Sequence, residues 1–188
     1  MVYKKVKLEL IFSFPLNSLY NKDFNVQDIE RVRNETEDFR SFIDKNSEKI
    51  FNLIKKYCGY DWTKRYIPVY ICENFPREAI SEPMILKIDS DKNWMIHLII
   101  HELVHENIPS HVIIENMKRN NLFIPGHQGL EIIISHITEK ILLEFLTEKE
   151  VKKIIVRDIK NDVEHKSVWN KSKKLKLDIN NKSLSEIF

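Results

Sequence analysis

Apolar residues recur at every second position over residues 6–14, which is the spacing of a strand with one buried face. The apolar set is Val6, Leu8, Leu10, Phe12 and Phe14. Pro15 is expected to end this strand because proline has no backbone N–H for pairing. Two shorter apolar runs, over residues 67–72 and 84–88, predict further strands. The pattern therefore indicates a small sheet.

Helical spacing replaces this alternation over residues 26–57, where Asn46 and Ser47 are expected to separate two helices. Gly59 stands where the C-terminal cap of the second helix belongs. Most of the chain after residue 90 is also helical in pattern. The first helix expected there covers residues 91–107, is capped by Ser90 or Asp91, and ends before Pro109. Two more are expected over residues 110–119 and over residues 125–145, the latter with Pro125 in its first turn. The last covers residues 148–159 and opens with the capping-box pair Thr147 and Glu150.

The chain carries no internal repeat and no linker rich in proline, glycine or serine, so we predict one domain over residues 1–188. Residues 170–188 are rich in lysine and asparagine and are expected to form a loosely ordered tail or a late strand. The predicted fold class is α+β, with a small mixed or antiparallel sheet and several helices.

Composition narrows the classes of function. The 188 residues are 43% hydrophobic and 31% charged, with a formal net charge of +2, so the pattern predicts a globular protein without a nucleic-acid or membrane partner. Three glycines exclude a dinucleotide fingerprint, a phosphate-binding loop and a nucleophile elbow. The two cysteines cannot form a four-thiolate zinc site, and Glu9 interrupts the apolar core that a signal peptide needs. We therefore expect a cytoplasmic setting.

The strongest chemical signal is the sequence His101-Glu102-Leu103-Val104-His105 inside a predicted helix. Histidines four positions apart project from one helix face, so both imidazoles can reach one metal ion. The carboxylate of Glu102 then lies on a neighbouring part of that face and can accept a proton from a metal-bound water. A mostly apolar helix makes uncompensated histidines costly, which favours a metal over a histidine pair in a metal-free core.

A catalytic zinc site needs a third protein ligand, and three residues qualify. Glu131 begins the apolar helical run that ends at His136, and a carboxylate there favours a cation partner. His111 and His127 are the alternatives. For His111 the chain would have to turn sharply at Ile108, which tolerates positive φ badly and precedes a proline. We therefore expect Glu131 to be the ligand.

With these residues in view, residues 84–146 resemble the zincin metallopeptidases, and within them the gluzincins, whose third ligand is a glutamate on a later helix. The size resembles the small minigluzincins. The resemblance implies a zincin-like domain, zinc bound by His101, His105 and Glu131, and peptide-bond hydrolysis with Glu102 as general base. It also implies an edge strand that holds an extended peptide or protein substrate, with residues 84–88 in that place.

Three further residues have a weaker expected role near the site. Ser135 and His136 follow Glu131 by about one turn and are expected to support a ligand or contact substrate. His97 precedes His101 by one turn and is expected to be a surface or hydrogen-bonded histidine, with a place in the lining of the cleft as the alternative. The sequence leaves two rival classes: a non-catalytic zinc-binding regulatory or interaction protein on a zincin fold, and a structural protein without metal. It sets neither the substrate nor the oligomeric state.

Overall fold

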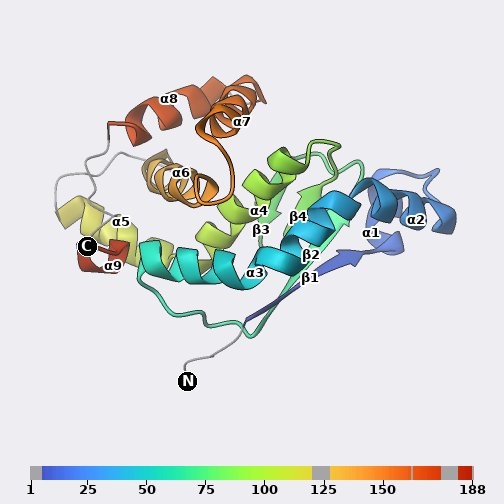
Figure 1. Cartoon of the computed structure of the whole chain (residues 1–188), viewed down its shortest axis with the longest axis horizontal. Helices are drawn as coiled ribbons and strands as arrows, with labels where there is room; N and C mark the ends of the chain where they lie inside the picture. Colours follow the sequence, from blue (N-terminus) through green and yellow to red (C-terminus); the bar gives the residue numbers. More distant parts are fainter. Residues whose placement is uncertain (1–5, 120–127, 162, 175–181, 188) are drawn as a thin grey trace. The chain divides into compact units, whose positions relative to one another are not determined.

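The computed structural model describes residues 6–119, 128–161, 163–174 and 182–187 (Figure 1). The structure is mixed α+β and largely helical. Contacts divide the chain into two compact units, one made of Met1–Phe51 and Trp62–Glu102, the other of Asn52–Asp61 and Leu103–Phe188. Two helices, α3 (Glu37–Cys58) and α4 (Lys92–Asn107), run from the first unit into the second. In the described part of the chain, no helix is long and apolar enough to cross a membrane.

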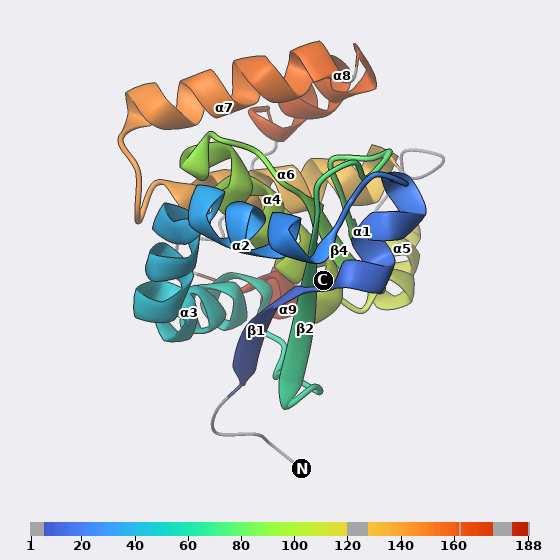
Figure 2. The same ribbon diagram turned by 90° about the vertical axis from the view of Figure 1, so that its right-hand side faces the viewer.

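A four-stranded mixed sheet lies in the first unit, with strand order β1-β2-β4-β3. Strands β1 (Lys7–Phe12), β2 (Tyr66–Cys72) and β4 (Met84–Lys87) run parallel, and the ribbons of β1 and β2 lie side by side in Figure 2. The short strand β3 (Ala79–Ser81) pairs antiparallel with β4 at the edge. The three strands expected from sequence are confirmed. The placement of residues 84–88 at the edge is wrong, because the unpredicted β3 covers that side of β4.

Helix α1 (Phe14–Tyr20) follows β1 directly, and the sequence pattern did not predict it. The strand ends at Phe12, before it reaches Pro15, so this proline does not end it as expected. Pro15 instead lies in the first turn of α1, where its missing N–H costs nothing because first-turn N–H groups have no helical partner. Buried Asn17 fastens α1 to β2: its side-chain amide donates to the Ile71 carbonyl at 3.0 Å and accepts from the Glu73 N–H at 2.8 Å. Asn17 is therefore a structural polar group.

Helices α2 (Val26–Glu35) and α3 separate at Thr36, so the expected break at Asn46 and Ser47 is wrong. The Thr36 hydroxyl donates to the Val32 carbonyl at 2.8 Å, a local bond that competes with regular helix geometry. Asn46 instead donates from its side chain to the Phe42 carbonyl at 2.8 Å and stays within α3. The predicted cap at Gly59 is confirmed, since this glycine has φ 80° and its N–H bonds the Lys55 carbonyl at 2.8 Å.

Helix α4 begins after Asp91, as predicted, and the Asp91 side chain accepts from the N–H groups of Asn93 and Trp94 at 2.9 and 3.3 Å. Helices α5 (Ser110–Arg119) and α6 (Gln128–Leu142) also confirm the sequence pattern. The proposed start of α6 at Pro125 lies outside the described residues. The apolar residues of α4 lie on all faces of the helix, and nearly all of the helix is accordingly buried.

Helix α7 (Glu148–Asn161) opens with the predicted capping box, in which Glu150 accepts from the Thr147 N–H at 2.8 Å. Helix α8 (Val163–Ser172) contacts both α6 and α7 and was not predicted. The first residues of the expected tail belong to α8, and its end forms the short helix α9 (Leu184–Ile187), in which Leu184 is buried. Residues 175–181 lie outside the described residues.

Candidate metal centre

Helix α4 supplies two histidines, His101 and His105, that lie one turn apart on one face. From Trp94 to Val104 every residue except His101 is buried, and His105 is again partly exposed. The two imidazoles therefore stand where an otherwise buried helix opens to solvent. This arrangement lets a small ligand or water reach them.

Helix α6 supplies Glu131 from its first turn. The neighbouring residues Leu130, Ile132, Ile133 and Ile134 are buried, whereas 13% of the Glu131 side chain is exposed. A carboxylate in the first turn is stabilised by the positive end of the helix dipole. A carboxylate is also the form of this side chain that binds metal.

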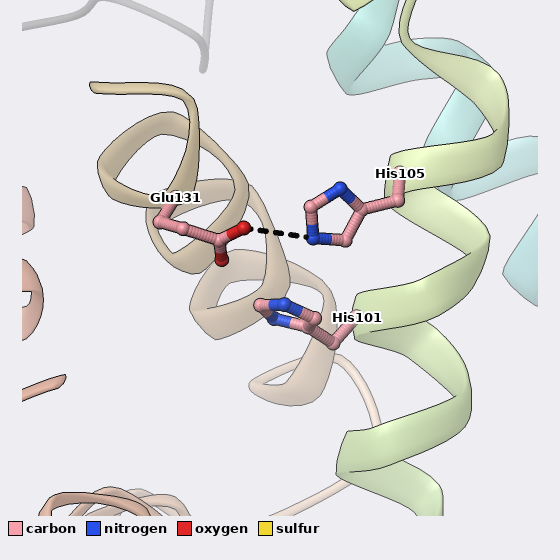
Figure 3. A group of neighbouring side chains, drawn as sticks. All are labelled: His101, His105 and Glu131. Atoms are coloured by element: carbon pink, nitrogen blue, oxygen red, sulfur yellow. Dashed lines mark ion pairs between the residues drawn. The ribbon is translucent and has the colours of Figure 1, made fainter. Parts of the chain in front are cut away.

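The three side chains converge, as Figure 3 shows. His105 Nε2 lies 3.2 Å from Glu131 Oε1, and one donor atom from each of His101, His105 and Glu131 lies within 4.8 Å of the others. Zinc bonds of about 2.0–2.2 Å in a tetrahedron place neighbouring ligand atoms about 3.3–3.6 Å apart, so the His105–Glu131 separation is already close to that range. Two imidazoles and a carboxylate form a donor set that zinc accepts. This group can hold a metal ion.

Glu102 follows His101 directly on α4 and is 8% exposed. It is not a member of the ligand group formed by the described residues. Its position agrees with the expectation that it is a neighbour of the site and not a metal ligand. Its role as a proton acceptor stays a prediction.

The two alternative third ligands lie in different places. His111 is an exposed residue of α5, and among the described residues it does not belong to the ligand group. The physical reason is the chain path: α4 ends at Asn107 and a new helix starts at Ser110, so His111 does not continue the face of His101 and His105. His127 lies outside the described residues.

The residues with weaker expected roles are divided by the structure. His97 is 2% exposed and its ring contacts that of His101, with centroids 5.9 Å apart. Ser135 is buried on α6, where its role stays a prediction. His136 bonds the backbone of Ser172 on α8, and burial together with nearby Lys140 lowers its pKa.

Two groups of residues escaped the sequence pattern. The ring of Trp94 contacts that of His97 in a tilted arrangement, and the sequence signal for it was its position one turn earlier on α4. Asp158 of α7 accepts from Trp169 Nε1 at 2.7 Å and pairs with His165 Nδ1 at 3.0 Å. No spacing rule indicates this second group, because its members lie on two helices and α8 was not predicted.

Nucleophilic cysteine chemistry is not favoured here. Cys58 and Cys72 are both free and buried, and burial raises the pKa of each thiol. A thiol kept protonated by burial is a poor nucleophile. The chemistry of the described residues therefore concentrates at His101, His105 and Glu131.

Comparisons of the chain with models of protein families, with curated proteins and with solved structures find no match.

Proposed function

We propose that the chain is a zinc-dependent metallopeptidase. The observation that carries the proposal is the 3.2 Å contact between His105 Nε2 and Glu131 Oε1, with His101 in the same group. Three protein ligands leave one position of tetrahedral zinc open, as catalytic sites require. Zinc bound there would polarise a carbonyl oxygen and lower the pKa of a coordinated water to about 7.

Glu102 is the general base in this proposal. Its carboxylate accepts a proton from water as the water oxygen bonds the carbonyl carbon of the substrate. The same proton then passes to the amide nitrogen while the C–N bond breaks, which yields a carboxylic acid and an amine. The low exposure of Glu102 supports the role, because bulk water then competes little for its carboxylate.

The edge of the sheet supports a proposal for the class of substrate. β3 lies at one end of the strand order, so an extended peptide can add to its outer edge through backbone hydrogen bonds. This type of pairing recognises the peptide backbone and leaves side-chain preference to the surrounding residues. We therefore propose a peptide or protein segment in extended conformation as substrate.

Metal content separates this proposal from a metal-free protein. Protein purified without chelator or a metal-affinity tag should contain about one zinc per chain, because the three ligands form one site. Elemental analysis measures this ratio directly. A preparation that lacks zinc and takes up none when zinc is added would contradict the proposal.

A matched pair of variants separates a peptidase from a non-catalytic zinc protein. Glu102→Gln keeps the shape of the side chain but removes the proton acceptor, so hydrolysis of a quenched peptide library should fall by at least about 10²-fold while zinc is retained. Glu106→Gln makes the same change one turn later on α4 and should leave the rate near wild type. Equal cleavage by both variants would exclude Glu102 as the base. Absence of cleavage by wild-type protein that contains zinc would favour the regulatory class.

A further inference from the structure

Three rings contact one another in a tilted stack along α4. His97 lies one turn before His101, and the two ring centroids are 5.9 Å apart with an interplanar angle of 57°. On its other side His97 contacts Trp94, at 5.0 Å between centroids and 40° between planes. Trp94 is fully buried and His97 is 2% exposed. The ring of His101 therefore packs against a buried neighbouring ring, that of His97.

The far end of the stack is fixed to the sheet. Trp94 Nε1 donates to Glu78 Oε2 at 3.1 Å, and the other Glu78 oxygen lies 3.6 Å from Lys87 Nζ. Glu78 directly precedes edge strand β3, and its carbonyl accepts from the Lys87 N–H of β4 at 2.9 Å. Asp91 also caps the backbone N–H of Trp94. The indole therefore has little freedom to rotate.

We propose that His97 is a positioning residue that holds the ring of His101 in the orientation needed for zinc. The proposal rests on the zinc site proposed above. An imidazole on a helix surface samples several orientations and loses that freedom when it binds metal. A ring held by a buried, hydrogen-bonded stack has lost it already, which strengthens binding of the metal. The stack thus extends from Glu78, beside the sheet edge, to the first ligand.

Mere packing is the rival explanation for His97, and it predicts a different pattern of effects. A packing residue changes the stability of the metal-free protein, whereas a positioning residue also changes zinc affinity. His97→Ala removes the ring, and His97→Phe keeps a flat ring between Trp94 and His101. Ile71→Val, a trim of a fully buried residue in β2, is the control for stability alone.

The experiment measures zinc affinity by competition with a chromophoric chelator, and the thermal stability of the metal-free form. We expect His97→Ala to bind zinc about 10–100-fold more weakly, the usual effect of groups that orient a ligand. His97→Phe should recover most of this loss. Ile71→Val should lower stability and leave zinc affinity unchanged. The visible absorption of the Co²⁺-substituted protein should shift in His97→Ala and not in Ile71→Val.

Glu78→Ala keeps the proposal testable if His97→Ala fails to fold. This variant changes neither histidine but removes the acceptor of the Trp94 indole N–H, so zinc affinity should again fall. Unchanged affinity in Glu78→Ala and in the His97 variants would overturn the positioning role while leaving the zinc site intact. Equal losses in His97→Ala and His97→Phe would also overturn it. Failure of the wild-type protein to bind zinc would instead contradict the proposed function, and this inference with it.

Discussion

The contact between His105 and Glu131 has two chemical explanations at the scale of single residues. A shared metal ion and an ion pair with a protonated imidazole both accommodate a separation of 3.2 Å. A partly exposed ion pair contributes about 0–1 kcal/mol to stability. This contribution is small compared with the cost of placing polar groups beside buried isoleucines. His101 adds a second imidazole that the pair does not need and that zinc does. We therefore propose a shared metal ion as the explanation of this contact.

Substitution of the third ligand tests this explanation. Glu131→Ala should release zinc at chelator concentrations that the wild-type protein withstands, with a loss of affinity larger than the roughly 10–100-fold effect of residues outside the ligand set. His111→Ala is the matched control and should retain zinc, because His111 is exposed on α5. Zinc content after dialysis against a chelator series measures both. Zinc loss in His111→Ala alone would move the third ligand to that histidine.

The ligands were predictable from sequence to different degrees. His101 and His105 depend only on helix geometry, which a spacing of four residues determines. Glu131 depends on tertiary structure, but its apolar neighbours made it conspicuous. The contacts of His97 were not predictable. Because α4 carries apolar residues on all of its faces, its sequence does not indicate which face packs against which neighbouring element.

At the scale of elements, the buried carboxylate of Asp158 joins α7 to α8 through Trp169. Trp169→Phe removes an N–H donor at 2.7 Å from a charged acceptor, so the free energy of unfolding should fall by about 1.5–3 kcal/mol. Trp62→Phe is the control, because Trp62 Nε1 donates to a neutral carbonyl, that of Phe51, at 3.3 Å. It should cost about 0.5–1.5 kcal/mol. Denaturant titration of metal-free protein measures both, and a larger loss in Trp62→Phe would contradict this account of the α7–α8 contact.

The contact between α6 and α8 predicts a dependence on pH. Burial and Lys140 lower the pKa of His136 below its ordinary value of 6.5, and a bond to the Ser172 backbone opposes this only in part. Below about pH 6.5 the unfolded chain therefore binds a proton that the folded chain does not yet bind. The free energy of unfolding consequently decreases as the pH is lowered below about 6.5. His136→Asn removes the titrating group.

Unfolding at pH 7.5 and pH 5.5, in the presence of chelator, checks the sign of this effect. The wild-type protein should lose more unfolding free energy between the two pH values than His136→Asn, because the other histidines are common to both chains. An equal loss in the two proteins would show that His136 does not contribute.

The elements that sequence missed share a physical cause. Helix α1 is one short helix attached to a strand, and β3 has three residues, so neither carries enough periodicity to be detected. Helix α8 follows α7 almost without a break. Helix α7 was predicted because its apolar spacing and its capping box agree, and α4 was predicted because a long apolar run follows the capping residue Asp91.

At the scale of the whole molecule, the site depends on residues far apart in the sequence. His101 and His105 come from α4, and Glu131 comes from α6. A ligand that binds only the native arrangement of these helices stabilises the folded chain as a whole. Zinc binding would thus raise the free energy of unfolding in addition to its role in the proposed reaction.

The central claim is that His101, His105 and Glu131 bind one zinc ion, and anomalous diffraction at the zinc absorption edge tests it most directly. Crystals of zinc-loaded protein should show one strong anomalous peak about 2.0–2.2 Å from a nitrogen of each histidine and from a Glu131 carboxylate oxygen. A peak with other ligands would contradict the claim. So would the absence of any peak while His105 and Glu131 remain in contact, since that contact would then be an ion pair.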